Sequence, residues 1–492
     1  MALFDYTCSF DDLSDTPNTV KLLGGNIVAN AVSTCKVTID DSQLLSLRQV
    51  PGEVADLIDL AVAVYVADRL SIRQAPRSHR TQIHVVVPVR RPEILRSSQV
   101  SDQLNNILYW FTGEHWSFDF THRTYGGRTA EQQMPLALAD ALSEPSEVAL
   151  WSGGLEALAG LCSRLSAEPS GRYTLLGTGS NTLLHSVQQQ VAVRLKNKFP
   201  NRIRLIQIPI RLDESTTLRK EPSQRSRGFV FMLLGAACAY LAGKTALHIY
   251  ENGIGAINLP FRASEVGIDH TRSVHPLSLL DMGNFVTALL GTRFSFENPF
   301  LFYTKAVMCQ ALVKVDCVDL AFETISCDRL HRERPMHCGY CSSCILRRQA
   351  LAVHGIKDQT RYIATARPTE SQAPWQLPLP LKPLTNIAAA RPVESQMFLK
   401  PKHAHRLAML HQVKELREIL STRSPWDSFV YKYPRLAEIV DRTASHTSMA
   451  PEVMRERLIQ LYQTYVCEWD NDSVRHRIGE ELLGGARMQG AA

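Results

Sequence analysis

Four cysteines lie within eighteen residues of this 492-residue chain, with the spacing Cys327-x10-Cys338-x2-Cys341-x2-Cys344. Thiolates separated by two residues can reach one metal ion through a tight turn, and zinc favours four such ligands in a tetrahedron. Gly339 would ease the turn, because glycine adopts backbone angles that other residues avoid. Since four cysteines leave no position for water, the pattern predicts one structural zinc ion rather than a catalytic one.

The cysteine cluster is also compatible with chemistry that does not involve zinc. An iron–sulfur cluster uses four thiolates as well, and the four residues could be unrelated buried thiols or a redox pair. His331 and His337 lie inside the loop and could replace one cysteine, but four cysteines suffice. The chain has eleven cysteines and its N-terminus lacks a secretory pattern, which indicates reduced thiols and a metal rather than disulfides.

A second chemical signal is a Ser-Gly-Gly turn that directly follows the apolar segment 148–151. Two glycines let the backbone come close to an anion, and the next helix points its free N–H groups at the same place. The pattern is typical of a pyrophosphate cradle, although the same three residues also form ordinary turns. The residues predicted to bind a nucleotide here are Ser152, Gly153, Gly154, Leu155, Glu156 and Ala157.

Basic residues crowd the polar loop before the apolar segment 229–242. At the carboxyl edge of a parallel sheet they could neutralise a triphosphate, and a solvated run of charges is the alternative. Lys305 could bind phosphate as a point charge or be an ordinary surface lysine. The basic residues of the loop are Arg219, Lys220, Arg225 and Arg227.

Polar residues that could recognise a substrate follow further along the chain. Glu251 and Asn252 come directly after the apolar segment 246–250, and a carboxylate beside a carboxamide suits the edge of a purine-like ring. A capped turn is the alternative, because Asn-Gly pairs are common in turns. Arg272 and His275 could bind the substrate or orient its carboxylate, although a lone histidine is also often structural.

Strands and helices are expected to alternate after residue 146. Apolar periodicity predicts strands at 148–151, 173–176, 203–210 and 246–250, with helices at 157–165, 182–196 and 228–241 between them. This order predicts an α/β fold whose parallel sheet is covered on both faces. Right-handed crossovers would then place the loops at the carboxyl ends of the strands on one edge.

The flanking regions are expected to form separate units. Residues 53–70 show the apolar stripe of an amphipathic helix, and 83–89 a short buried strand. Aromatic residues in 104–120 favour a core over a binding face. Seven prolines between 368 and 401 predict a linker. The predicted division is an N-terminal accessory α+β domain (1–145), a central domain (146–362) with a zinc knuckle (327–344), a linker (363–402) and a helical C-terminal region (403–492), with helices at 403–420 and 451–469.

The composition of the chain bears on whether its partners include nucleic acid or a membrane. The net charge of +6 permits contact with phosphates but does not demand nucleic acid, so no nucleic-acid partner is expected. The longest apolar run, 229–242, is shorter than the roughly 20 residues that span a bilayer and predicts a buried helix. A cytoplasmic location without a membrane partner is therefore expected.

The Ser-Gly-Gly turn followed by the cysteine cluster resembles the ATP pyrophosphatase (PP-loop) superfamily, whose signature is Ser-Gly-Gly-x-Asp-Ser. Within it, Ser326-Cys327 and the run His-Cys-Gly-Tyr-Cys-Ser-Ser-Cys at 337–344 resemble QueC, the 7-cyano-7-deazaguanine synthase. The resemblance covers roughly residues 147–355. Because ordinary QueC is much shorter, the whole chain is more similar to the QueC-like proteins of bacterial anti-phage systems, QatC of the Qat system first and the QueC-like protein of type IV CBASS second. The stretches 224–227, 251–260, 271–276 and 298–305 carry this similarity.

The resemblance implies a PP-loop (adenine nucleotide alpha hydrolase-like) fold that uses ATP and Mg²⁺ in addition to zinc. The carboxylate of 7-carboxy-7-deazaguanine would be adenylated with release of pyrophosphate, and a nitrogen nucleophile would then attack. The nucleophile is ammonia in QueC, whose product is a nitrile, and an amine of a partner protein from the same operon in the defence branch. The resemblance favours catalytic roles for Arg225, Arg227 and Lys305, and substrate binding by Glu251, Asn252, Arg272 and His275.

One departure from the signature bears on activity. Glu156 and Ala157 stand where the superfamily has Asp and Ser. Glutamate keeps the charge but reaches one methylene farther, and alanine removes a hydroxyl whose bond to phosphate would contribute about 1 kcal/mol. The alternatives are therefore a degenerate subunit that binds a nucleotide or a partner without catalysis, a nitrile-forming 7-cyano-7-deazaguanine synthase, or a tRNA-modifying PP-loop enzyme.

Overall fold

The computed structural model describes residues 2–10, 19–27, 31–72, 81–123, 127–128, 131, 145–179, 181–212, 220–221, 225–261, 272–327, 337–363 and 400–475. Most of the predicted linker, residues 364–399, lies outside this set, as do Arg219 and His331. In the part of the chain that is described, no helix combines the length and apolar character needed to cross a membrane.

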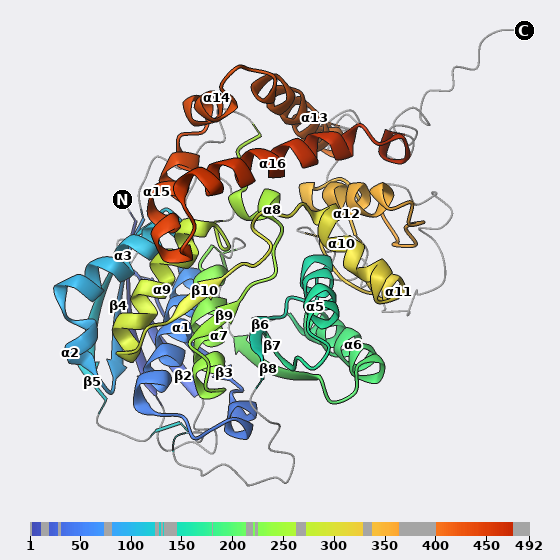
Figure 1. The fold of residues 1–492 in the computed structure, drawn as a ribbon. Helices are drawn as coiled ribbons and strands as arrows, with labels where there is room; N and C mark the ends of the chain where they lie inside the picture. Colours follow the sequence, from blue (N-terminus) through green and yellow to red (C-terminus); the bar gives the residue numbers. More distant parts are fainter. Residues whose placement is uncertain are drawn as a thin grey trace, which may run out of the picture.

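Ten strands of the described chain form one sheet in the order β10-β9-β6-β7-β8-β3-β2-β1-β4-β5 (Figure 1). Six of the nine neighbouring pairs are parallel, and β8–β3, β3–β2 and β2–β1 are antiparallel. The fold is thus mixed α/β with a mostly parallel sheet, as the alternation predicts. The strands are β1 (Ala2–Phe10), β2 (Thr19–Asn26), β3 (Ala31–Ile39), β4 (Thr81–Val89), β5 (His115–His122), β6 (Glu147–Leu150), β7 (Tyr173–Gly179), β8 (Ile203–Leu212), β9 (Ala246–His248) and β10 (Ser295–Glu297).

Helices cover both faces of the sheet (Figure 1). Val148 and Leu176 enter one core while their neighbours Ala149 and Leu175 enter the other, because successive side chains of a strand point to opposite faces. The first core includes α1 (Gly52–Leu70), α3 (Ser98–Thr112), α7 (Arg227–Leu241) and α9 (Pro276–Leu290). The second includes α5 (Leu155–Ala167), α6 (Thr182–Lys198), α10 (Lys305–Lys314) and α12 (Ser342–Val353). Shorter elements are η1 (Ser42–Ser46), α2 (Pro92–Leu95), α8 (Gly253–Ile257) and α11 (Val318–Ala321).

The strands and helices predicted between 148 and 250 all occur, with ends that differ by a few residues. β7 continues to Gly179 because it stays paired with β8 up to Pro209, and β9 ends at His248. The prediction for residues 53–70 was wrong in one respect. α1 is buried on every side from Val54 to Leu70 rather than along one stripe, because it packs against β4 on one side and against α7 and α9 on others.

The first 145 residues and the central region share one sheet. β3 pairs antiparallel with β8 in the register Val37↔Leu212, Thr38↔Arg211 and Ile39↔Ile210. The first core also contains side chains from both ranges. The division at residues 145 and 146 remains a prediction about domains, and both parts contribute strands to a continuous layer.

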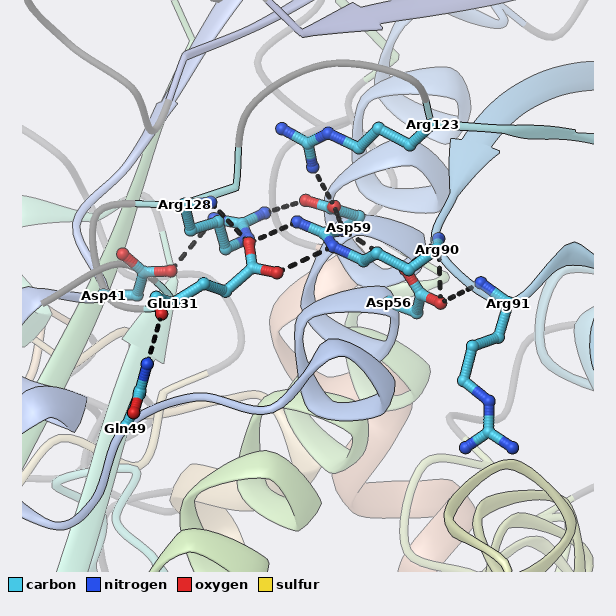
Figure 2. A network of polar contacts seen from close by, with 9 residues as sticks. All are labelled: Asp41, Gln49, Asp56, Asp59, Arg90, Arg91, Arg123, Arg128 and Glu131. Atoms are coloured by element: carbon cyan, nitrogen blue, oxygen red, sulfur yellow. Dashed lines mark hydrogen bonds and ion pairs between the residues drawn. The ribbon is translucent and has the colours of Figure 1, made fainter. Parts of the chain in front are cut away.

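A network of charged side chains ties α1 to the ends of the N-terminal strands (Figure 2). The carboxylate of Asp59, on α1, is fully buried and accepts hydrogen bonds from Arg90, Arg123 and Arg128. Arg128 also donates to the buried carboxylate of Asp41 over 2.9 Å. Because Arg90 follows β4, Arg123 follows β5 and Asp41 follows β3, the network joins three strands to one helix at a single place.

The C-terminal region is helical, as predicted, and packs on the central region around a core of its own (Figure 1). The two predicted helices occur, the first of them beginning at Lys400, inside the range assigned to the linker. Two further helices lie between them. The four are α13 (Lys400–Leu420), α14 (Pro425–Lys432), α15 (Arg435–Thr447) and α16 (Pro451–Trp469).

Candidate functional site

The Ser-Gly-Gly turn connects β6 to α5 and depends on both of its glycines. Gly153 has a φ of +75°, which side chains other than glycine rarely adopt. A Cβ atom on Gly154 would lie 3.3 Å from the carbonyl oxygen of Ile325, a tight contact that the backbone around residue 325 would have to relieve by shifting slightly. The N–H of Ile325 donates to the carbonyl of Gly153 over 3.0 Å. The turn is therefore held against the segment that leads into the cysteine cluster.

Backbone N–H groups of this turn converge on two hydroxyl oxygens. The N–H of Gly154 donates to the Ser152 hydroxyl over 3.1 Å, and the N–H of Leu155 donates to the Ser326 hydroxyl over 3.2 Å. N–H groups at the start of a helix attract anions. The oxygens of a phosphate could accept these hydrogen bonds in place of the two hydroxyls. Ser152 is exposed, whereas Gly153, Gly154 and Leu155 are buried.

Glu156, in the first turn of α5, forms an ion pair with Lys305, the first residue of α10. The side chain of Lys305 is 4% exposed and that of Glu156 15%. Burial favours the neutral acid, but the charge of Lys305, its hydrogen bond to the carboxylate and smaller effects together lower the pKa of Glu156. Burial likewise disfavours the charged lysine, and the Glu156 carboxylate raises the pKa of Lys305. Two residues 149 positions apart therefore hold each other charged beside the turn.

Glu251 lies near this pair and behaves differently. Burial raises its pKa to about 8, the Glu156 carboxylate acts in the same direction, and Lys305 opposes them. Its carboxyl accepts hydrogen bonds from the backbone N–H of Asn252 at 3.0 Å and from the side-chain amide at 2.6 Å. The Asn252 side-chain oxygen in turn caps α8 by accepting from the N–H of Gly255 over 2.9 Å. At neutral pH Glu251 is mostly a neutral acid that can donate as well as accept.

We expect Lys305→Met to destabilise the fold by about 3 kcal/mol, because it leaves the largely buried Glu156 carboxylate without its counter-charge. The double variant Glu156→Gln with Lys305→Met should recover most of that loss, since neither charge then remains. Urea unfolding of the four proteins of this cycle gives the coupling free energy. A double variant that loses as much stability as the two single variants lose together would show that the pair is not coupled.

Glu251 predicts a pH dependence of stability. Its folded pKa of about 8 lies above the ordinary value of 4.5, so the folded chain binds one proton more than the unfolded chain between these pH values. The stabilisation that this extra proton gives to the folded state is complete below pH 4.5 and is lost as the pH rises to 8. The free energy of unfolding then falls by at most about 1.4 kcal/mol per pH unit. Glu251→Gln should therefore gain stability relative to wild type between pH 5 and 8, as measured by urea unfolding. Glu456→Gln, on the exposed side of α16, is the matched control and should show no such gain.

The four cysteines form a site that can hold a zinc ion. Their sulfur atoms all lie within 4.8 Å of one another. The sulfurs of Cys338 and Cys344 are 3.8 Å apart, which is about the separation that zinc–sulfur bonds of 2.3 Å impose in a tetrahedron. Backbone N–H groups of three of the cysteines donate to the sulfurs of Cys327, Cys338 and Cys341 over 3.2–3.4 Å.

Two residues that the sequence analysis did not assign connect the cysteine cluster to the turn. Ser326 precedes Cys327, and its hydroxyl accepts from Leu155 and, at 3.4 Å, from Arg347. Arg347 is fully buried on α12 and also donates to the hydroxyls of Thr324 at 2.8 Å and Thr360 at 3.0 Å. The one signal that the sequence offered was the position of Arg347, one turn after Cys344. Folding of the cluster therefore fixes Ser326, which contacts the start of α5.

A third residue that sequence reasoning missed is Glu468, near the end of α16. Its buried carboxylate accepts from the hydroxyl of Thr304, next to Lys305, and from the amide of Gln349 on α12 at 2.9 Å. Burial raises the pKa of Glu468 to about 7, against the effect of both hydrogen bonds. The helical C-terminal region thus contacts the residues that flank the candidate site.

The other predicted site residues make contacts away from the turn. The Arg225 guanidinium donates to the carbonyl of Thr112, at the end of α3, over 2.9 Å. The guanidinium of Arg227 lies over the Phe231 ring at 4.7 Å. Arg225 ties the start of α7 to α3, whereas Arg227 packs along α7 itself. Their predicted catalytic role remains a prediction.

Arg272 and His275 gather around Trp110 of α3. The guanidinium of Arg272 lies 4.0 Å from the centre of the indole ring, and that of Arg435 lies 4.3 Å from it. His275 caps α9 by accepting from the N–H of Leu277 over 3.3 Å. Burial, with the charges of Arg435 and Arg272, lowers the pKa of His275 to about 3, so the ring is neutral at ordinary pH. The structure brings Glu251 and Asn252 to the Glu156–Lys305 pair. It places Arg272 and His275 beside Trp110 instead.

Two comparisons with known proteins bear on this site. Residues 278–355 match the family of queuosine biosynthesis protein QueC. A 7-cyano-7-deazaguanine synthase of Acinetobacter baylyi is 28% identical over 160 residues, which are 32% of this chain and 63% of the relative, so the match spans less than two thirds of that enzyme. The chain is therefore QueC-like over a segment that includes Lys305 and all four cysteines.

Proposed function

We propose that this chain is an ATP-using enzyme that adenylates the carboxylate of a 7-deazaguanine and joins it to a nitrogen nucleophile. The observation that carries the proposal is the Glu156–Lys305 ion pair. It joins the Ser-Gly-Gly turn to the segment that matches QueC, so two separate signals meet at one point of the fold. The PP-loop identity of the fold and the use of ATP are parts of the same proposal.

The proposed reaction has two steps. A carboxylate oxygen of 7-carboxy-7-deazaguanine attacks the α-phosphorus of ATP, which forms an acyl-adenylate and releases pyrophosphate. The nitrogen nucleophile then attacks the acyl carbon and loses a proton, and AMP leaves. The N–H groups of Gly154 and Leu155 would hold the departing pyrophosphate, and Lys305 would neutralise its charge. Mg²⁺ would supply further neutralisation, and the Glu156 carboxylate is the residue that would help to hold it.

Recognition of the deazaguanine falls to Glu251 and Asn252 in this proposal. A neutral carboxyl group beside a carboxamide offers donors and acceptors together, as the edge of a purine-like ring requires. Both residues lie beside the Glu156–Lys305 pair, which would place the ring next to the phosphates. A binding role for Arg272 and His275 would require the ring to reach toward Trp110.

We infer that the nucleophile is an amine of a partner protein encoded in the same operon, and that the enzyme acts in anti-phage defence in the cytoplasm. The regions on both sides of the QueC-like segment support this, since they resemble the longer defence proteins. A nitrile-forming 7-cyano-7-deazaguanine synthase that uses ammonia is the nearest alternative, because the matched relative carries that name.

The test is pyrophosphate release from ATP with 7-carboxy-7-deazaguanine, supplied in turn with ammonia and with each protein encoded beside the gene. Release is expected, together with a partner protein whose mass increases by that of one 7-carboxy-7-deazaguanine less one water. Formation of the nitrile with ammonia alone would assign the chain to ordinary synthase activity.

A binding subunit without catalysis is the second candidate function. The specific observation in its favour is that buried Ala157 offers no hydroxyl to a phosphate. ATP binding without pyrophosphate release, with all partner proteins present, would support this candidate and end the enzyme proposal.

A further inference from the structure

A cavity of about 500 Å³ opens at the edge of the sheet opposite the Ser-Gly-Gly turn. It is lined by residues at the beginnings of β7 and β8, among them Tyr173 and Ile203, whereas the turn follows the end of β6. Since β6, β7 and β8 run parallel, the length of the strands separates the cavity from the turn. The volume is within the range of about 300–1,000 Å³ that is usual for small-molecule sites.

Four arginines line this cavity, and no aspartate or glutamate is among the described residues that line it. Arginine is the side chain best suited to phosphate, because its planar guanidinium can donate two parallel hydrogen bonds and keeps its charge. The four are Arg48, Arg172, Arg202 and Arg204.

Two of these arginines are fixed by the backbone and two stand at the rim. Arg202 donates to the carbonyls of Gly171 at 2.9 Å and Leu165 at 3.2 Å, and Arg204 donates to the carbonyl of Ser46 at 3.1 Å. These acceptors are neutral, so they leave the positive charges in place. Arg48 and Arg172 are exposed. The site thus has an inner pair of cations held by backbone carbonyls and an outer pair that is exposed to solvent.

A second cavity, of about 700 Å³, shows the contrast. There the cations are paired with acids: Arg194 with Asp319 and Glu323, and Lys198 with Asp316 over 3.0 Å. Beside the first cavity one repulsion between cations is evident: burial and then the positive charge of Arg204 lower the pKa of Lys196, which does not itself line the cavity. An anion in the arginine-lined cavity would relieve that repulsion.

We propose that this cavity binds a small phosphorylated molecule, at a site separate from the Ser-Gly-Gly turn. The phosphate would lie among the four arginines. Leu47, Leu241 and Ala242, which also line the cavity, offer an apolar wall for the rest of the ligand. A site of this kind at the opposite edge of the sheet suits an effector or a phosphorylated product, and it does not depend on the proposed ligase reaction.

The experiment is titration calorimetry of the full chain with inorganic pyrophosphate in the absence of divalent ions. We expect Arg48→Gln with Arg172→Gln to lose one binding equivalent, or to weaken it at least tenfold. The control is Arg211→Gln with Arg423→Gln, which changes the net charge equally at two exposed positions outside the cavity. It should bind as wild type does. All substituted residues are exposed, and thermal unfolding verifies that each variant folds.

Three outcomes would overturn the proposal. Wild type could fail to bind pyrophosphate, the cavity variant could bind as many equivalents as wild type, or the control could lose binding to the same extent. Stronger, arginine-dependent binding of a ten-nucleotide RNA than of pyrophosphate would also overturn it, because the arginines would then contact a nucleic-acid backbone.

Discussion

Cys341→Ser is expected to abolish stoichiometric zinc binding and to destabilise the chain severely. Cys341 is both a candidate ligand and the capping residue of α12, whose N–H at Cys344 donates to its sulfur over 3.4 Å. In zinc-finger peptides the metal contributes about 10–16 kcal/mol, so losing one ligand of four removes a large share of local stability. Metal analysis after gentle purification and thermal unfolding measure the two effects.

Cys467→Ser is the matched control, because Cys467 is an exposed thiol outside the cluster. It should keep one zinc ion per chain and the unfolding temperature of wild type. Wild-type protein with clearly less than one zinc ion, or a Cys341→Ser variant that retains it, would remove the case for a structural site. Visible absorption bands of iron and sulfide would assign the cysteines to an iron–sulfur cluster instead.

Asp59→Asn should lower the free energy of unfolding by about 3–5 kcal/mol. This is the second substitution for which we expect a large effect. The substitution keeps the shape of the side chain but removes the charge that Arg90, Arg123 and Arg128 share in a buried site (Figure 2). Urea unfolding should show a lower midpoint at an unchanged slope. Asp102→Asn, on the exposed face of α3, is the control and should leave the midpoint in place.

Acid provides an independent check on the same residue. Burial opposes ionisation of Asp59, but the three arginines together lower its pKa below the ordinary 3.8. The stabilisation is therefore present above pH 3.8 and is lost as the pH falls through the lowered pKa. The difference in stability between wild type and Asp59→Asn should shrink only below about pH 4. A difference that already shrinks well above pH 4 would mean that the charge of Asp59 is not its source.

Local patterns predicted much of the fold and part of the site. The cysteine spacing and the two glycines act within a few residues, and both appear in the structure as tight turns. The pairing of Glu156 with Lys305 and of Ser326 with Leu155 could not be predicted, because each joins positions about 150 residues or more apart. Only the arrangement of α5, α10 and the knuckle segment brings them together.

For Arg225 and His275 the sequence suggested binding roles, whereas the structure shows packing contacts. Their types suited a phosphate and a carboxylate, but the sequence could not reveal that α3 packs across the start of α7 and α9. There the guanidinium of Arg225 donates to the carbonyl of Thr112, and burial keeps His275 neutral. Helix α1 illustrates the same point, because helices and strands surround it on all sides where its sequence indicated one apolar face.

The antiparallel pair β3–β8 has a consequence for synthesis on the ribosome. Residues 37–39 of β3 find their partners only at 210–212. At elongation rates of about 5–20 residues per second, β8 is made roughly ten to thirty seconds after β3. During that interval β1, β2 and β3 have an open sheet edge that could pair with another nascent chain. Truncation between residues 146 and 202 should therefore yield an aggregation-prone product rather than an independent N-terminal domain.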